Sequence, residues 1–302
     1  MTVALASIRD LLLPGVMELP GKYDMIPAQW KGYYSQGKSQ MAVERSVSLR
    51  FLGLASLKNE GAPTQFDNNA GERFIYSQEH IEIGLGYAIT RKAVADNLYK
   101  TQFDPSNLGL MESFAQTKEI LAANLLNTAT TYNSQIGGDG VSLVNTAHPV
   151  DGFSIANQPS TDVDLNESTL YSALITIRQF RNNAGLKIFA RGRKLLVPIW
   201  LEYVAARLTK TELRPGTADN DVNALLHTGG LSEGYEVLDF LTSQYAWFVL
   251  TNIKGLIYLE REPFETSMWV DDTTDNLLTK GYERYSFGYN DWRAVFGTFP
   301  TA

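Results

Sequence analysis

Apolar and polar residues alternate in two segments of the first third of the chain, residues 46–57 and 80–89. Alternation of this kind is typical of strands with one buried face. The stretch between the two segments is rich in Gly, Asn and Asp, which favour turns. We therefore expect an extended two-stranded β-hairpin over residues 46–90 with a wide, polar tip. The apolar positions that define it are Val47, Leu49, Phe51, Ile81, Ile83 and Leu85.

A two-stranded hairpin is only marginally stable by itself in water. The predicted hairpin therefore needs a surface to pack on, and the pattern allows either its own domain or a neighbouring subunit. Residues 1–45 have the same requirement, because prolines, glycines and aromatic residues such as Trp30 and Tyr33 are scattered there without a period. This composition predicts an irregular N-terminal arm with no core of its own.

The middle of the chain changes to a helical period. Leu110, Phe114 and Leu121 fall on one face of a long amphipathic helix that we expect over residues 107–131. A glycine-rich break follows this helix, and residues 141–146 have the composition of a strand.

Helices and strands then follow one another. Asn166 is placed to cap a helix, residues 195–197 predict a short buried strand, and Pro198 is suited to begin the next helix. Residues 212–234 predict a long polar loop, and loops of that length are usually functional or mobile. Further strands are expected over residues 235–241, 246–251 and 256–260, and over a C-terminal segment in which Tyr285, Phe287 and Tyr289 share one face. This mixture predicts an α+β fold.

Composition narrows the classes of protein to which the chain can belong. The chain has 302 residues, of which 44% are hydrophobic, enough for a sizeable core. The net charge of −7 gives no general attraction to nucleic acid or anionic membranes. The chain has no cysteine, which excludes disulfides and thiol chemistry. No apolar run is long enough for a transmembrane helix, and the N-terminus is a poor signal peptide, so we expect residence in a cytoplasm.

Little in the sequence indicates catalysis. The histidines, His80, His148 and His227, have no metal-ligand spacing, and no nucleophile elbow or phosphate-binding glycine motif occurs. The acidic pairs near residues 219–221 and 271–272 could bind a cation, but solvated loops are the simpler interpretation. The basic run at residues 191–194 is more simply a solvated edge than a phosphate site. We expect no catalytic residue, no cofactor and no metal, and therefore a protein that is not an enzyme.

Several motifs carry a family resemblance. The run Glu283-Arg-Tyr-Ser-Phe-Gly-Tyr289, followed by Trp292-Arg-Ala-Val-Phe-Gly297, resembles the C-terminal end of tailed-phage major capsid proteins, in particular the Mu-like head subunit. Leu143-Val-Asn-Thr-Ala-His-Pro149 is similar to a strand and Ala-His-Pro pattern in the same proteins. Lys194-Leu-Leu-Val-Pro198 and Ala246-Trp-Phe-Val-Leu250 are further matches, and the motifs occur in the family's order over most of the chain.

The resemblance implies the phage major capsid fold named after phage HK-ninety-seven. The parts that it implies are an N-terminal arm (1–45), an extended hairpin loop (46–90), a peripheral domain with the spine helix (91–165), an axial domain (166–255) and return strands of the peripheral domain (256–302). The function implied is a major head protein that self-assembles into pentamers and hexamers of an icosahedral shell around double-stranded DNA.

The resemblance also implies partners and a location. Partners are other copies of the chain, a scaffolding protein and a portal during assembly, the packaged DNA through non-specific contacts and a decoration protein, with no membrane. The expected location is the virion capsid, after assembly in the bacterial host cytoplasm. Two alternatives remain open: an encapsulin-like shell, which has the same fold but cages an enzyme, and a soluble hydrolase with an unsignposted acidic site.

Contacts between subunits are expected from the hairpin and the arm, because both need a surface to pack on. The candidates are Val47, Leu49, Phe51, Lys58, Glu60, Phe66, Ile81, Ile83, Trp30 and Tyr33. The long loop is expected at the capsomer axis, where symmetry mates crowd and a regular element would clash. Its candidates are Pro215, Gly216, Asp219, Asn220 and Asp221.

Overall fold

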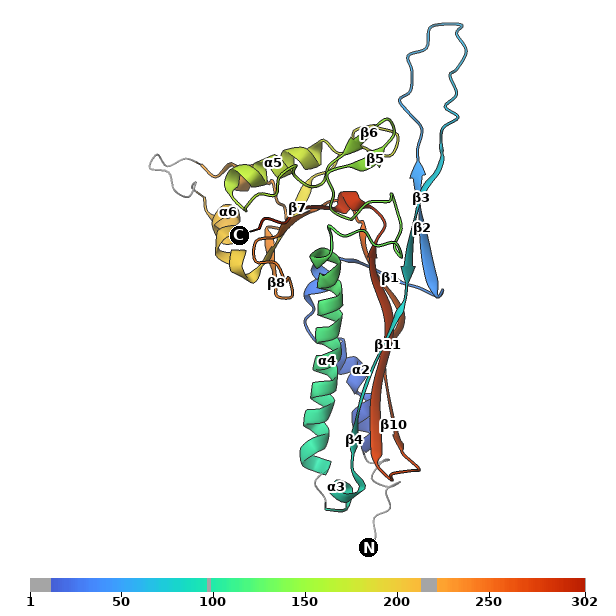
Figure 1. Cartoon of the computed structure of the whole chain (residues 1–302), viewed down its shortest axis with the longest axis vertical. Coiled ribbons are helices and arrows are strands. Elements are labelled where there is room, and N and C mark those ends of the chain that lie inside the picture. Colours follow the sequence, from blue (N-terminus) through green and yellow to red (C-terminus); the bar gives the residue numbers. More distant parts are fainter. Residues whose placement is uncertain (1–11, 97–98, 213–221, 302) are drawn as a thin grey trace.

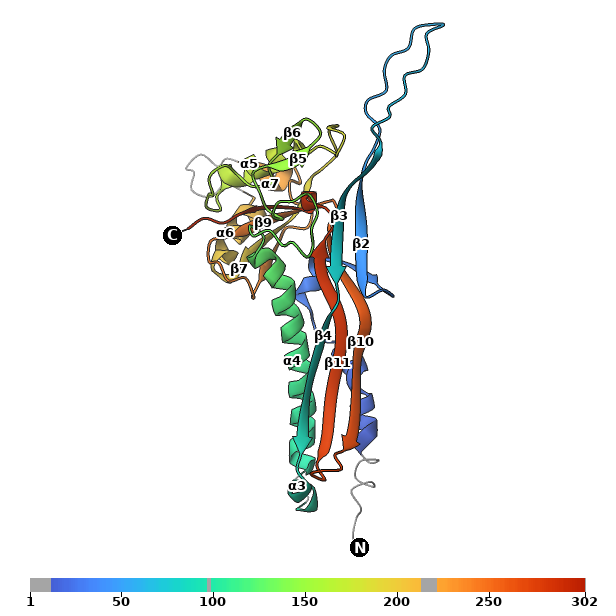
Figure 2. The ribbon, with the colours of Figure 1, turned by 45° about the vertical axis from the view of Figure 1, so that its right-hand side comes forward.

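The molecule is elongated and has three visibly different parts (Figure 1). The computed structural model describes residues 12–96, 99–212 and 222–301. One part is compact and built of short helices and strands. The second is long and narrow, with one helix running beside long strands. The third is a hairpin that projects beyond the compact part, and the turned view in Figure 2 shows the same projection.

The narrow part contains a long four-stranded sheet. Its strands, in spatial order, are β1 (Ser35–Lys38), β10 (Leu256–Val270), β11 (Leu277–Tyr289) and β4 (Ile81–Ile89). β1 runs parallel to β10, and the other neighbours are antiparallel. Tyr285 and Tyr289 are buried and the ring of Phe287 lies 5.0 Å from that of Tyr258, so the C-terminal alternation does form a strand with a packed aromatic face.

The spine helix α4 (Tyr99–Asn127) lies along this sheet. It begins and ends several residues earlier than the range 107–131 that its apolar period predicts. Pro105 lies inside it, which removes one backbone donor without ending the helix. Phe114 is buried against Phe264 of β10 with ring centroids 4.9 Å apart, and the short helix α3 (Arg91–Ala95), capped by the side chain of Thr90, precedes α4.

The compact part is built on a second sheet. Its strands, in spatial order, are β12 (Val295–Thr298), β9 (Trp247–Thr251), β7 (Gly192–Pro198) and β8 (Tyr235–Leu238). The helices beside it are α5 (Glu167–Arg178), η2 (Ile199–Leu201), α6 (Glu202–Lys210) and α7 (Ala224–His227). Asn166 caps α5 through a capping box with Thr169, as its sequence position predicts. β12 belongs to this second sheet, although it lies in the segment 256–302 that was expected to supply return strands of the peripheral domain.

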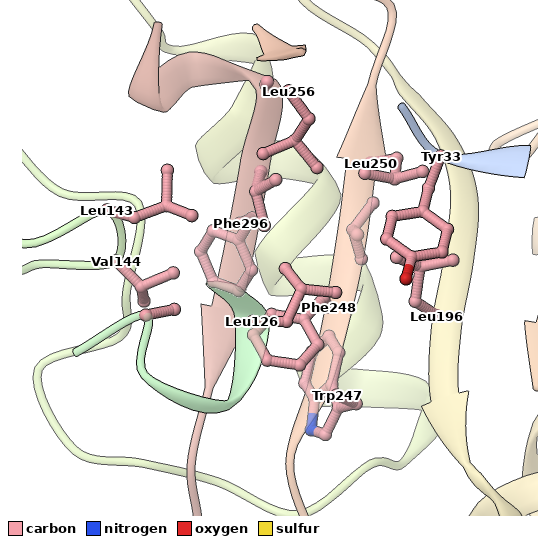
Figure 3. Packing of buried hydrophobic residues seen from close by; sticks show 14 of the residues in the cluster. Tyr33, Leu126, Leu143, Val144, Leu196, Trp247, Phe248, Leu250, Leu256 and Phe296 are labelled. Atoms are coloured by element: carbon pink, nitrogen blue, oxygen red, sulfur yellow. The ribbon is translucent and has the colours of Figure 1, made fainter. Parts of the chain in front are cut away.

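A shared core joins the two parts. Figure 3 shows Trp247 and Phe248 of β9 beside Leu126 near the end of α4, with Leu196 of β7 close by. These four side chains are almost completely buried. Because burying a large apolar side chain contributes roughly 1.5–3 kcal/mol, this contact holds the spine helix against the second sheet.

The N-terminal arm packs on its own subunit. Residues 12–17 are helical, and α2 (Leu19–Tyr23), the 3₁₀ turn η1 (Gln29–Gly32) and β1 follow. Trp30 is only 5% exposed, and its ring lies 4.2 Å from that of Tyr258. The arm therefore completes the core of the long sheet.

The structure corrects two expectations about strands. The hairpin pairs β2 (Val43–Arg50) with β3 (Gly71–Glu79), whereas β4 leaves the hairpin at His80 and joins the long sheet. The alternation over residues 80–89 was the right signal for a strand, but alternation alone does not identify a partner. Residues 141–146 form no strand, and the small antiparallel pair β5 (His148–Val150) and β6 (Phe153–Ile155) comes just after them.

Candidate functional site

The hairpin exposes a series of apolar side chains. Val47 and Leu49 share one face of β2, as their spacing predicts. Phe51 follows just beyond the last residue of the strand, and all three side chains are exposed. Beyond β2 and before β3, residues 51–70 form the hairpin tip, which contains no strand. A strand pair with an uncovered apolar face is unstable in water unless something packs on it.

The hairpin tip is less polar than the sequence indicates. Leu57 is 103% exposed and Phe66 82% exposed, and Leu54 is also exposed. Lys58 and Glu60, the charged contact candidates, lie among them and are exposed too. The Asp67 carboxylate folds the tip locally by accepting hydrogen bonds from the backbone N–H groups of Gly53 and Asn69, which hold its pKa below the ordinary value.

The base of the hairpin is fixed to the compact part through Asn183. The Nδ2 group of Asn183 donates to Ser48 Oγ at 2.6 Å and to the Leu49 carbonyl at 3.0 Å, and its Oδ1 accepts from Arg293 Nη2 at 2.9 Å. Arg73 of β3 donates to the Asn183 carbonyl at 2.6 Å. Both hairpin strands are thus held by one residue of the loop after α5.

A partly buried arginine adds a second attachment. Arg50, the last residue of β2, donates from Nε and Nη2 to Asp151 Oδ2 at 3.0 and 2.8 Å. Asp67 also lies 3.7 Å from its Nη1. The hairpin therefore leaves the body in a fixed direction, while the apolar side chains of its tip lie beyond these attachments.

Other contact candidates lie in less favourable places. Trp30 and Tyr33 are buried in the subunit's own core, so the expectation that they contact a neighbouring subunit is corrected. Ile83 is half-buried against the same core, and its contact with a neighbour stays a prediction. Ile81 is partly exposed but belongs to β4 of the long sheet and not to the hairpin. Aromatic residues in an irregular arm do need a partner surface, and here the subunit supplies it.

The candidates for the capsomer-axis loop, Pro215, Gly216, Asp219, Asn220 and Asp221, all lie outside the described residues. The described neighbourhood adds a surface that sequence reasoning missed. Ile199, Trp200 and Tyr203 are exposed on η2 and the first turn of α6, with Tyr203 77% exposed, while Ala205 and Leu208 face the core. Amphipathic spacing predicts a helix here, but it does not say that the bulkier face points outward.

A buried ion pair ties the arm, the spine helix and the long sheet together. Lys118 Nζ lies 2.6 Å from Glu283 Oε2, and the Tyr23 hydroxyl donates to the same carboxylate at 3.2 Å. The Lys118 ammonium lies 4.7 Å from the ring centroid of Tyr285, where an aromatic face stabilises a cation. Burial raises the pKa of the Glu283 carboxyl, and the Lys118 ammonium and the Tyr23 hydroxyl counteract part of that rise.

Glu119, the next residue on the spine helix, holds the arm by a different contact. Its carboxylate accepts from the backbone N–H of Gln29 at 2.6 Å and of Trp30 at 3.2 Å. Burial raises the pKa of Glu119, and these two hydrogen bonds lower it in part. Both buried acids of the narrow part therefore have structural partners.

Two of the three histidines, His80 and His148, have structural partners as well. His148 is completely buried and stacked on Trp292, with Nδ1 at 2.6 Å from Asp139 Oδ2 and Nε2 at 3.0 Å from Asn157 Oδ1. Both ring nitrogens are therefore engaged within the fold. His80 is buried beside Ser39 Oγ at 2.8 Å, and burial together with the Arg284 charge lowers its pKa.

The described residues offer no cluster of His, Cys, Asp or Glu side chains that could hold a metal ion. In the part of the chain that the structure covers, no helix is both long enough and apolar enough to cross a membrane. Within the basic run, Lys194 pairs with Glu236 at 2.9 Å and Arg193 with Glu233 at 3.3 Å, so two of its cations are already neutralised.

A spine helix along a long sheet, a second compact domain and a projecting apolar hairpin define a shell subunit of the HK-ninety-seven type. Solved structures share this fold. They include the mature capsid of bacteriophage PhiM1 (10% identity, TM-score 0.57, 92% of this chain and 89% of that chain). The procapsid of bacteriophage JBD30 matches at 14% identity with a TM-score of 0.53 over 99% of this chain and 77% of that chain.

A virus-like particle from Pyrococcus furiosus shares the fold too, at 8% identity and a TM-score of 0.54, over 94% of this chain and 98% of that chain. No curated protein matches the sequence significantly. The family model described as phage capsid protein matches residues 80–297. The chain therefore belongs to the phage capsid protein family, and its function is that of a major capsid shell protein.

Proposed function

We propose that the chain assembles into pentamers and hexamers of a closed icosahedral shell that encloses the double-stranded DNA of a tailed phage. The family match over residues 80–297 supports the shell, and the exposed apolar hairpin supports contacts with neighbouring copies. The net charge of −7 suits a container whose wall does not bind DNA tightly. The single observation that carries the proposal is the family match.

The finer parts of the function follow from the same proposal. The chain acts without catalysis, assembles with a scaffolding protein and a portal in the host cytoplasm, and remains in the virion, where a decoration protein can bind the outer surface. The hairpin contributes Val47, Leu49 and Phe51, with Lys58, Glu60 and Phe66 of its tip, to contacts between subunits. Residues 212–234 lie at the capsomer axis, and a density map that places them at the outer periphery of the shell would contradict that position.

Light scattering of the purified chain tests the proposal. We expect capsomers or closed shells, because an exposed apolar hairpin favours association. Nuclease-resistant DNA inside shells recovered from infected cells distinguishes a phage head from an encapsulin-like compartment, which would hold a protein cargo instead. Catalytic turnover by a stable monomer would support the hydrolase alternative and contradict the proposal.

A further inference from the structure

Ser39 and His80 form the junction between the hairpin and the long sheet. Ser39 lies between β1 and β2, where the chain enters the hairpin, and His80 lies between β3 and β4, where it leaves. Figure 2 shows β3 leading into β4 at this point. The backbone N–H of Ser39 donates to the carbonyl of Glu260 on β10 at 2.8 Å. Because both residues are buried, the junction ties the two chain crossings to each other and to the long sheet.

Counting hydrogen bonds places the proton of the neutral His80 ring. The single proton of the Ser39 hydroxyl is 2.6 Å from Glu44 Oε1, measured between oxygens, and 3.3 Å from the Met41 carbonyl, and both of these oxygens can only accept. The contact of 2.8 Å between His80 Nε2 and Ser39 Oγ is therefore donated by Nε2–H. The other ring nitrogen, Nδ1, is buried, and no described atom forms a hydrogen bond with it. A second proton on the ring would lie at Nδ1 without a partner.

The surroundings of the ring oppose that second proton. Burial is the main reason that the pKa of His80 lies below its ordinary value, and the cation Arg284 of β11 is the next. Glu44 of β2 acts in the opposite direction, and Arg261 of β10 lowers the pKa further. Glu82, on the strand that follows His80, lies 3.8 Å from Arg284 Nε and is exposed. The charges on the neighbouring strands therefore favour a neutral ring.

The sign of the pH dependence follows from this lowered pKa. The unfolded chain binds the second proton of His80 more readily than the folded chain does. The stabilisation from the closed junction is therefore fully present above the ordinary histidine pKa of about 6.5, and it is lost as the pH falls from there towards the folded pKa.

A cavity of about 310 Å³ adjoins the junction and gives a charged ring a route to water. His80 and Glu79 line this cavity, together with Ser286 of β11 and Gln135 of the loop after α4. A ring that moves into the cavity can hydrate Nδ1 and lies near the exposed Glu79 carboxylate. The same movement breaks the contact with Ser39.

We propose that the junction of Ser39 with His80 is a pH-sensitive joint between the hairpin and the long sheet, closed while the ring is neutral and opened when the ring gains a second proton. The attachments of the hairpin to the compact part, through Asn183 and Arg50, involve no histidine. The hairpin therefore stays fixed to the compact part when the joint opens and becomes independent of the long sheet. The inference concerns a movement within one subunit and does not depend on the proposed shell function.

Amide hydrogen exchange on the purified full chain measures the opening. The backbone N–H groups of Ser39, Met41 and His80 donate within the junction. After correction for the intrinsic exchange rate at each pH, their protection should fall by at least about tenfold between about pH 7.5 and about pH 5. The amides of residues 46–49, beside the Asn183 attachment, should change by less than about threefold. Constant protection at the junction, or an equal loss in both segments, would overturn the proposal.

A substitution of the histidine separates its charge from its hydrogen bond. His80→Gln keeps a side-chain N–H for Ser39 and cannot become charged, so protection at the junction should stay high at both pH values. The matched control is His227→Gln, at an exposed histidine on α7, and it should keep the fall on acidification. A junction that opens on acidification in folded His80→Gln would show that another group controls it.

Nuclear magnetic resonance of ¹⁵N-labelled histidine rings covers the case in which His80→Gln does not fold. It uses the unaltered chain, in solution or as sedimented shells. At about pH 7.5 we expect the Nε2–H tautomer of His80, and below about pH 6.5 the ring should gain its second proton together with the loss of protection at the junction. An Nδ1–H tautomer at neutral pH, or a ring that titrates while the junction stays protected, would contradict the proposal.

Discussion

Individual buried charges in the narrow part connect elements that are distant in the sequence. Glu119 joins the spine helix to the backbone of the arm, and Lys118 pairs with Glu283 of β11 beside the Tyr23 hydroxyl. Both acids have a raised pKa because burial disfavours the carboxylate. These residues give the arm a defined position in the subunit, and they are the most direct places to test the structure.

The first prediction concerns the pH dependence of Glu119. Its raised pKa means that the folded state binds this proton more tightly than the unfolded state. The contribution of Glu119 to the free energy of unfolding is therefore largest at low pH and falls as pH rises from its unfolded to its folded pKa. The variant Glu119→Gln lacks this fall, so urea unfolding from about pH 4 to about pH 7 should show its stability rising relative to the unaltered subunit.

The matched control for that measurement is Glu112→Gln, at an exposed carboxylate on the same helix. It should change the pH profile less, because solvent screens an exposed charge. Parallel pH profiles for Glu119→Gln and the unaltered subunit would show that Glu119 is not buried against the arm.

The second prediction concerns the ion pair. Lys118→Met leaves the Glu283 carboxylate buried without its cation, so the unfolding free energy should fall by about 3–5 kcal/mol. The double variant Lys118→Met with Glu283→Gln removes the charge and keeps an acceptor for Tyr23, and it should recover part of that loss. Chemical unfolding of the unassembled subunits measures both. A double variant less stable than Lys118→Met would contradict the pairing.

At the scale of elements, we propose that the hairpin contributes more to assembly than to the folding of its own subunit. Its base is held by Asn183 and Arg50, whereas its tip has no contact that the core requires. Phe51→Asp illustrates the consequence. The sequence alone suggests a loss of subunit stability from a charge against apolar surface, but Phe51 is exposed in the subunit. An exposed substitution usually changes stability by no more than about 0.5 kcal/mol, so its effect should fall on assembly.

The third prediction is a deletion of the hairpin tip from Asn59 to Ala70. Apart from the half-buried Ala62 and Asp67, the residues removed are exposed, so the melting temperature of the unassembled subunit should change little. The yield of shells should fall by at least tenfold, because the apolar contact between copies is lost. Normal shells from the shortened chain, or a loss of subunit stability that matches the loss of assembly, would refute the intersubunit role of the hairpin.

Sequence patterns predicted elements better than they predicted pairings. The capping box at Asn166 and the buried strand near Leu196 are local signals, and both are present in the structure. The predicted partner of β4 was wrong, because a strand with an alternating pattern can pair at the edge of many different sheets. The sequence left open whether Trp30 packs on its own subunit or on a neighbour, and it could not identify the partner Tyr258, which lies far away in the sequence.

At the scale of the whole molecule, the fold separates a rigid body from a projecting contact element. Two sheets share a core around the end of the spine helix. The arm packs on the long sheet of the same subunit. We propose that many modest contacts of the hairpin type, repeated around a shell, give a stable container without any single strong interface.

Electron cryomicroscopy of the assembled chain tests the central claim most directly. The account predicts closed icosahedral shells with rings of five and six subunits, and a map into which this subunit fits with each hairpin tip lying on a neighbouring copy. A monodisperse monomer that persists when scaffolding protein is added, or shells in which every hairpin tip contacts only its own subunit, would contradict it.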